Sequence, residues 1–138
     1  MAKIIHTILL LCCLSIKAQK IKGKTYIATT SVSCMELSDG GGCSIYQYCY
    51  LQFEKKYANV FFKSVFYCSS KERELEFDNS NPEVKKYSWK KEGETIIVKG
   101  FNNYGILKIE EGKLVGTKEM NYKEFVPTEF KEELCQKK

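Results

Sequence analysis

The sequence predicts a mostly β protein, an antiparallel up-and-down meander of about eight strands with a short C-terminal helix. After residue 23, apolar and polar residues alternate with period two in most segments, which is typical of half-buried strands. Short turns containing Gly, Asn and Asp separate these segments, and short connections join antiparallel neighbours. Closing such a meander into a small barrel removes the exposed edges of an open sheet. A strongly curved open sheet or a two-layer sandwich is the competing prediction.

The first 18 residues have the features of a signal peptide. Lys3 supplies a positive charge, an apolar run follows over residues 8–14, and Ala18 is a small residue at the expected cleavage site. The apolar run is shorter than the ~20 residues that a transmembrane helix needs. We therefore expect a secreted, periplasmic or cell-envelope protein that is cleaved near Ala18. Residues 19–138 then form a single domain.

Cys12 and Cys13 raise the alternative of a lipid-anchored bacterial lipoprotein. Lipid attachment would require a small residue directly before the modified cysteine. Leu11 is large, and Cys12 would be an unusual residue before Cys13. We therefore expect neither a lipid anchor nor a transmembrane segment.

Five cysteines remain after the predicted cleavage, namely Cys34, Cys43, Cys49, Cys68 and Cys135. In an exported chain such residues are disulfide candidates rather than metal ligands, and no C-x-x-C pair is present. Five is an odd number, so at most two bridges form within one chain. The sequence alone does not fix their connectivity. The favoured pairing joins Cys68 to Cys135, with a second bridge among the other three cysteines.

The sequence is poor in catalytic side chains. The only histidine, His6, lies in the predicted leader, which excludes Ser-His-Asp and Cys-His catalysis in the mature chain and removes the commonest transition-metal ligand. We therefore predict no catalytic, metal-binding or cofactor-binding residues. A hydrolase that uses two glutamates is the one enzymatic alternative.

The charge of the chain does not favour nucleic acid as a partner. The formal net charge is +5, and subtracting the two lysines of the leader leaves +3. The lysines are scattered among glutamates, and Arg73 is the only arginine, whereas nucleic-acid readers rely on arginine.

The strands can be placed one by one. The predicted strands are residues 24–33, 45–54, 58–68, 72–78, 84–91, 94–99, 104–110 and 113–119. Residues 34–44, which contain Asp39 and three glycines, are predicted to form a loop that Cys34 and Cys43 could close. Pro127 could start the terminal helix, in which Phe130 and Leu134 would share a face and pack onto the sheet.

Aromatic residues occupy both faces of the second and third predicted strands. One set, Leu51, Phe53, Phe62 and Phe66, is sufficient to fill a core. The other set, Tyr46, Tyr48, Tyr50, Phe61 and Tyr67, forms a possible binding face, because an exposed apolar patch of this kind marks an interaction site. The favoured interpretation is that the loop at 34–44 or the terminal helix covers this second set. Trp89 alternates with Tyr87, which favours core packing over a carbohydrate platform.

The chain resembles the lipocalin-like (calycin) small barrels, including their relatives in bacterial envelopes. The resemblance rests on Gly23 before the first strand, on the meander, and on a C-terminal helix that a bridge from Cys135 to Cys68 could tether. It covers residues 22–136 and implies a barrel. The family's G-x-W motif has no match, because Tyr26 stands one place late, and the T-D-x-x-Y motif is absent.

The sequence therefore predicts an exported, non-catalytic protein that binds a small apolar ligand or a protein partner. The first alternative is a secreted inhibitor or immunity-type protein that blocks an enzyme by occlusion. A glutamate-based hydrolase is the remaining alternative. A ligand-sized cavity or a filled core would distinguish a carrier from a scaffold.

Overall fold

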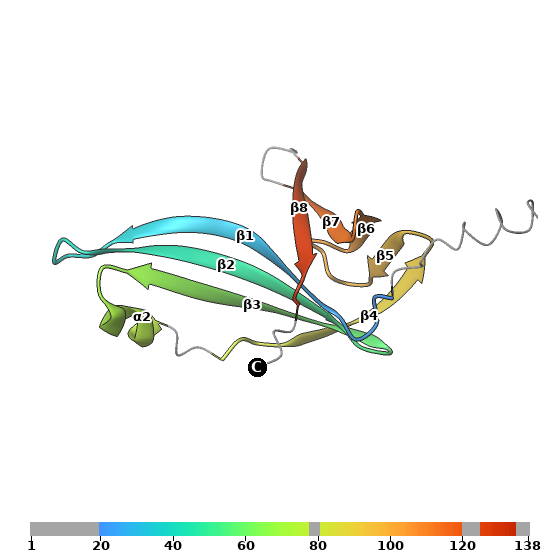
Figure 1. The fold of residues 1–138 in the computed structure, drawn as a ribbon, viewed down its shortest axis with the longest axis horizontal. Helices are drawn as coiled ribbons and strands as arrows, with labels where there is room; N and C mark the ends of the chain where they lie inside the picture. Colours follow the sequence, from blue (N-terminus) through green and yellow to red (C-terminus); the bar gives the residue numbers. More distant parts are fainter. Residues whose placement is uncertain (1–19, 78–80, 120–124, 135–138) are drawn as a thin grey trace, which may run out of the picture.

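The computed structural model describes residues 20–77, 81–119 and 125–134. Eight strands and one short helix follow one another along this part of the chain (Figure 1). They are β1 (Thr25–Glu36), β2 (Gly42–Phe53), β3 (Tyr57–Cys68), α2 (Lys71–Phe77), β4 (Lys85–Glu92), β5 (Thr95–Val98), β6 (Ile106–Glu110), β7 (Lys113–Glu119) and β8 (Phe125–Glu132).

Each strand pairs with its neighbours in sequence, and β8 returns to β1, so that the meander closes into a barrel. All pairings are antiparallel. The closing contact is short: Tyr26 and Ile27 lie opposite Glu132 and Lys131, and the Glu133 N–H donates to the Thr25 carbonyl at 2.8 Å. The predicted meander and its closure into a barrel are thus confirmed.

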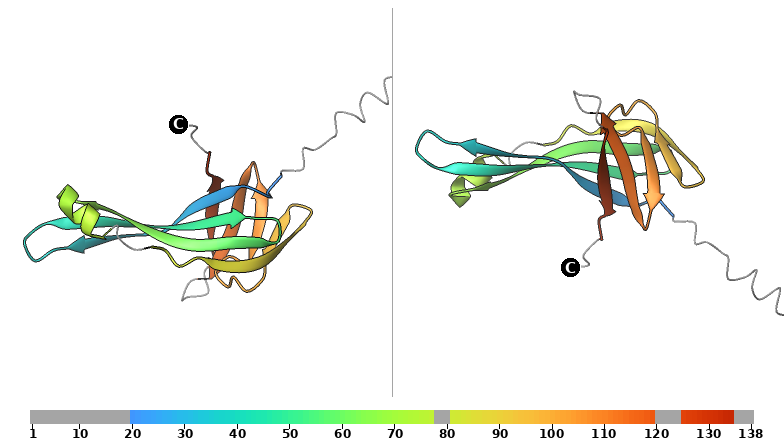
Figure 2. Two further views of the ribbon diagram at one scale, coloured as in Figure 1. Left: turned by 90° about the horizontal axis from the view of Figure 1, so that it is seen from below. Right: turned by 90° about the horizontal axis from the view of Figure 1, so that it is seen from above.

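Three strands, β1, β2 and β3, extend well beyond the barrel. β1, β2 and β3 each have 12 residues, whereas β5 has four. β4 pairs with β3 only over residues 57–60, and β8 pairs with β1 only over residues 26–27. The remaining parts of β1–β3 project from the barrel as a three-stranded sheet with α2 near its tip (Figures 1 and 2). We call residues 29–48 and 62–77 the arm.

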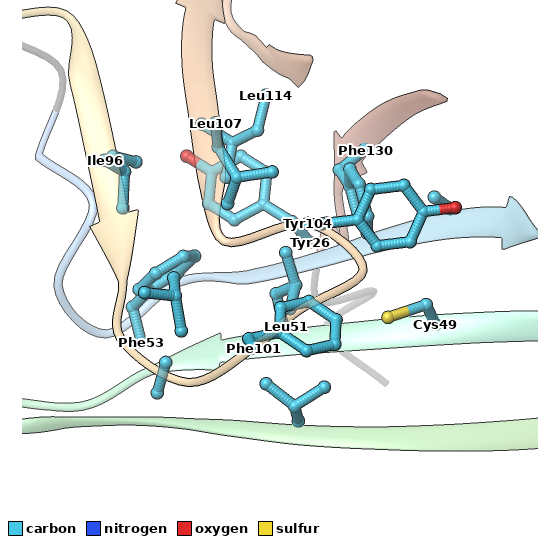
Figure 3. Close-up of a cluster of buried hydrophobic side chains, with 14 of the residues drawn as sticks. Tyr26, Cys49, Leu51, Phe53, Ile96, Phe101, Tyr104, Leu107, Leu114 and Phe130 are labelled. Carbon is cyan, nitrogen blue, oxygen red and sulfur yellow. The ribbon is translucent and has the colours of Figure 1, made fainter. Parts of the chain in front are cut away.

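Side chains fill the interior of the barrel. The largest completely buried ones are Tyr26, Leu51, Phe53, Ile96, Leu107, Leu114 and Phe130 (Figure 3). Aromatic rings meet edge to face, with centroids 6.0 Å apart for Tyr26 and Phe53 and 5.1 Å apart for Tyr104 and Phe130. Leu51 and Phe53 therefore belong to the core as predicted. Phe62 (36 % exposed) and the half-buried Phe66 do not.

The predicted C-terminal helix is wrong. Residues 125–132 form β8, and Phe130 is completely buried inside the barrel opposite Leu114. Leu134 lies beyond the strand and is 79 % exposed. Pro127 is tolerated because β8 is paired there on one side only, with Thr117 of β7, and proline is accommodated where its missing N–H faces away from the ladder.

The predicted strand at 72–78 is also wrong, because residues 71–77 form α2. Lys, Glu, Arg and Leu have high helix propensity. The Glu74 carboxylate accepts a hydrogen bond from the Cys68 N–H at 3.1 Å and pairs with Lys71 at 2.6 Å. Leu75, expected to point inward, is 70 % exposed. The eighth strand of the barrel is therefore β8.

The predicted loop at 34–44 is shorter than expected. β1 continues to Glu36 and β2 begins at Gly42, so that only residues 37–41 turn the chain. The predicted signal peptide, residues 1–18, lies outside the described residues. Among the helices that the structure describes, none is long and apolar enough to cross a membrane.

Candidate functional site

A disulfide ties the tip of the arm together. It joins Cys43 to Cys68, which lie directly opposite each other on β2 and β3. The favoured bridge between Cys68 and Cys135 is therefore wrong, and so is closure of the 34–44 loop by Cys34 and Cys43. Strand register explains the observed bond, because facing residues of an antiparallel pair lie within disulfide range. This register joins residues 25 positions apart.

The other described cysteines are unpaired. Cys34 is exposed, whereas Cys49 is buried in the barrel core, where burial raises the pKa of its thiol to about 12. Cys135 lies outside the described residues.

The five aromatic residues predicted to share a face do so in the structure. Tyr46, Tyr48 and Tyr50 alternate along β2, and the register places them next to Phe61 and Tyr67 of β3. We call these five residues the outer aromatic face. The rings of Tyr50 and Phe61 stack at 4.6 Å, and those of Tyr46 and Tyr67 meet edge to face at 5.6 Å. They form a cross-strand ladder on the side opposite to the core residues.

The predicted cover of this face is absent from the described residues. The turn at 37–41 lies at the end of the β1–β2 hairpin, and residues 125–132 belong to the barrel. α2 instead lies on the opposite, inner face of the arm. There the Phe77 ring stacks on Phe66 at 4.8 Å, and Arg73 pairs with Asp39. Tyr67 on the outer aromatic face is 55 % exposed.

The outer aromatic face is best shielded where it joins the barrel. Tyr50 lies close enough to Glu133, which follows β8, for this carboxylate to affect it. Burial raises the pKa of the Tyr50 hydroxyl, and the charge of Glu133 adds to the shift. Exposure is greatest at Tyr67, beside the tip.

A hollow lies on the inner side, where β3 and β4 diverge at the root of the arm. This mouth cleft has a volume of about 440 Å³, within the range of small-molecule sites. Val60, Phe62, Tyr87 and Phe101 provide its apolar walls, and Glu83, Lys85, Asn102 and Asn103 provide polar groups. No motif in the sequence predicts this cleft. Its one signal is the sequence Gly100–Gly105, where two aromatic residues flank two asparagines in a turn.

A second hollow, on the barrel, is lined mainly by carboxylates. Glu94, Glu110, Glu111 and Glu129 surround it. The Lys113 ammonium donates to the Glu129 carboxylate at 2.9 Å and lowers the pKa of Glu129. A glycosidase acid needs the opposite shift, toward a protonated carboxyl group at neutral pH. Within residues 20–77, 81–119 and 125–134, no group of three or more His, Cys, Asp or Glu side chains is placed to hold a metal ion.

Trp89 packs as expected. Its ring meets Phe53 edge to face at 5.1 Å, and its indole N–H donates to the Glu54 carbonyl at 3.0 Å. Tyr87 also lies against the core. Through these contacts the ring of Trp89 forms part of the barrel wall.

No protein-family model, curated protein or solved structure matches the chain. The likeness to calycin barrels therefore rests on architecture, namely eight antiparallel strands in a closed meander.

Proposed function

We propose that this chain is an exported, non-catalytic binding protein that engages a protein partner through the outer aromatic face. One observation carries the proposal: five aromatic side chains share the outer face of β2 and β3 in two groups of contacting rings, and no described element of the chain packs over the exposed end at Tyr67. Tyrosine is enriched in protein interfaces, because its ring contributes apolar contact area and its hydroxyl a hydrogen bond.

The shape of the molecule favours a protein over a small ligand. A carrier of calycin type would hold its ligand inside the barrel, but here Tyr26, Phe53, Phe130 and their neighbours fill that interior. The outer aromatic face is a sheet surface and not a concave pocket. Small molecules require concave sites that enclose most of their surface, whereas proteins bind to flat ones.

The projecting arm also fits the alternative of an inhibitor or immunity-type protein. α2 and the Cys43–Cys68 bond hold its tip, and a rigid element loses little conformational entropy on binding. The mouth cleft favours a second candidate function, the binding of a small ligand with an apolar body and a polar end, on account of its volume and aromatic walls.

Site-specific photo-crosslinking in the native host tests the main proposal. A photoreactive phenylalanine analogue replaces Tyr46 on the outer aromatic face, or Ile106, an exposed residue of the barrel, as the control. We expect a covalent adduct with a different protein from position 46 and none from position 106. Equal yields at both positions, no adduct at position 46, or an adduct made only of two copies of this chain would contradict the proposal.

Fluorescence titration tests the second candidate. The tyrosines and Trp89 are the intrinsic reporters, and fatty acids and haem are the probes. We expect a saturable change that is lost in Phe62→Ser, which alters one wall of the mouth cleft. Flat titrations with all probes remove this candidate and leave the main proposal intact.

A further inference from the structure

The two long edges of the arm differ in their protection. On the β3 side, the pairing with β4 ends at Val60, and α2 follows the strand directly, packs against its inner face and bonds to Cys68 through Glu74. On the β1 side, the pairing with β8 ends at Ile27, and apart from β2 no described strand pairs with residues 28–36. β1 thus presents an open edge along most of its length, as Figures 1 and 2 show.

A hydrogen bond across the hairpin identifies which backbone groups lie on this edge. The Leu37 N–H donates to the Gly41 carbonyl at 2.8 Å, across the β1–β2 hairpin. Because hydrogen-bonding direction alternates along an antiparallel strand, Met35, Ser33 and Ser31 also face β2. The N–H and C=O groups of Val32, Cys34 and Glu36 therefore point away from β2. A bulge at Thr29–Ser31 marks the lower limit of this regular edge.

The edge lacks the features that normally prevent strand pairing. Natural edge strands carry lysine, other inward charges or proline, or are covered. Residues 28–35 (ATTSVSCM) contain no charged residue and no proline. Val32 is 57 % exposed, and Ser31, Ser33 and Cys34 are exposed as well. The neutrality of this edge contrasts with the net charge of +5 of the chain.

We propose that residues 32–36 of β1 pair edge to edge with the same segment of a second copy, in an antiparallel, two-fold symmetric arrangement with Cys34 at its centre. An antiparallel edge is complementary to itself under a two-fold axis, because each outward residue offers one donor and one acceptor. A second copy also fits the charge, since two cationic chains meet here at a segment that contains no lysine or arginine and a single acidic residue, Glu36. The two arms then form one six-stranded sheet.

The symmetry determines where the aromatic side chains lie. Directly opposite residues in an antiparallel pair project from the same face of the sheet. Cys34 and the outer aromatic face lie on one side of the arm, because Cys34 is opposite Ser44 and Ser44 is opposite Tyr67. The dimer therefore presents two outer aromatic faces on the same side of one sheet. It forms a bivalent surface, which increases avidity for a partner with repeated sites.

Sedimentation analysis of residues 19–138, which contain every described element, tests the proposal. We expect a concentration-dependent mass of two chains for the wild type. Cys34→Lys places a charge in the middle of the edge and should yield a monomer. Cys34→Ser keeps the edge neutral and should leave the dimer intact, which shows that the pairing does not depend on a disulfide between two Cys34 thiols.

Ser44→Lys is the matched control for the edge. Ser44 lies directly opposite Cys34 and projects from the same face, but it belongs to the central strand β2. We expect this variant to remain a dimer. A retained Cys43–Cys68 bond and an unchanged circular dichroism spectrum confirm that each variant folds.

Amide hydrogen exchange gives a direct readout of the pairing. The Val32 and Cys34 amides should become protected as the protein concentration rises, with no comparable change at other exposed amides. The proposal is overturned by a monomeric wild type at high micromolar concentration, by a dimer that Ser44→Lys dissociates while Cys34→Lys does not, or by unprotected amides in a dimer. If the chain stays monomeric and the same amides become protected only after another protein is added, the edge pairs with a strand of that protein. This result would likewise overturn self-pairing.

Discussion

The replacement Phe130→Ala tests how the C-terminal segment closes the barrel. Phe130 is completely buried, lies opposite Leu114 and meets the Tyr104 ring at 5.1 Å. Removing a buried phenylalanine side chain costs about 3–5 kcal/mol, from lost transfer free energy and the cavity that remains. For a domain of this size we expect a fall in Tm of roughly 10–20 °C.

Leu134→Ala is the matched control, because Leu134 is 79 % exposed. Its effect on the free energy of unfolding, measured by urea denaturation, should stay within about 0.5 kcal/mol. In a terminal helix the two residues would share one face and both would contribute. Comparable losses for the two variants, or a loss below about 1 kcal/mol for Phe130→Ala, would refute the barrel-closing strand.

Four further measurements test the arm and the core. Replacing Cys43 and Cys68 by serine removes a disulfide between residues 25 positions apart, which contributes at most about 3.5 kcal/mol to the free energy of unfolding. Hydrogen exchange should then increase in the arm, while the barrel amides stay protected. In the native protein an alkylating reagent should label Cys34 but not Cys49, whose pKa is raised to about 12, whereas unfolding should expose both. The folded-state pKa of Cys49 lies above the unfolded value of 9.0, so its contribution to stability is complete below about pH 9 and is lost as the pH rises toward about 12. The free energy of unfolding should therefore fall more steeply with rising pH in the wild type than in Cys49→Ala. Gly116→Ala should destabilise the barrel by about 1–3 kcal/mol, because the new Cβ would lie 2.8 Å from a Leu107 methyl group.

Alternation predicted the strands well where one face meets a filled interior. In β2, Cys49, Leu51 and Phe53 point inward and are completely buried, and the residues between them point outward. A shift of one residue would reverse both faces, so the sequence strongly specifies this register. The same alternation correctly placed the members of the outer aromatic face together.

Local pattern failed in two short segments. Residues 72–78 alternate like a strand, but the Glu74 carboxylate has a partner at Cys68, and the Phe77 ring stacks on Phe66. Phe130 and Leu134 fit either a strand or a helix over so few residues. Tertiary contacts decide such cases, and these contacts come from distant parts of the chain.

The arm could not be predicted, because it results from a difference in length between neighbours. β1–β3 have 12 residues each, and the segments of β4 and β8 that pair with them are only four and two residues long. Strand lengths read from the sequence do not show which neighbour stops pairing first. The cover of the outer aromatic face depends on this mismatch and was predicted incorrectly. The Cys43–Cys68 pairing, also predicted incorrectly, depends on the register between β2 and β3.

The way the arm is stabilised supports a role for its outer surface. Beyond the barrel, neither face of a three-stranded sheet has a core to pack against, and such a sheet needs other support. Here α2 and the Cys43–Cys68 bond both act on the inner face, where Phe77 covers Phe66. The opposite face retains tyrosines, and Tyr67 is 55 % exposed near the tip. Solubility alone would favour charged residues at these positions, so the arrangement supports a partner that packs against the tyrosines.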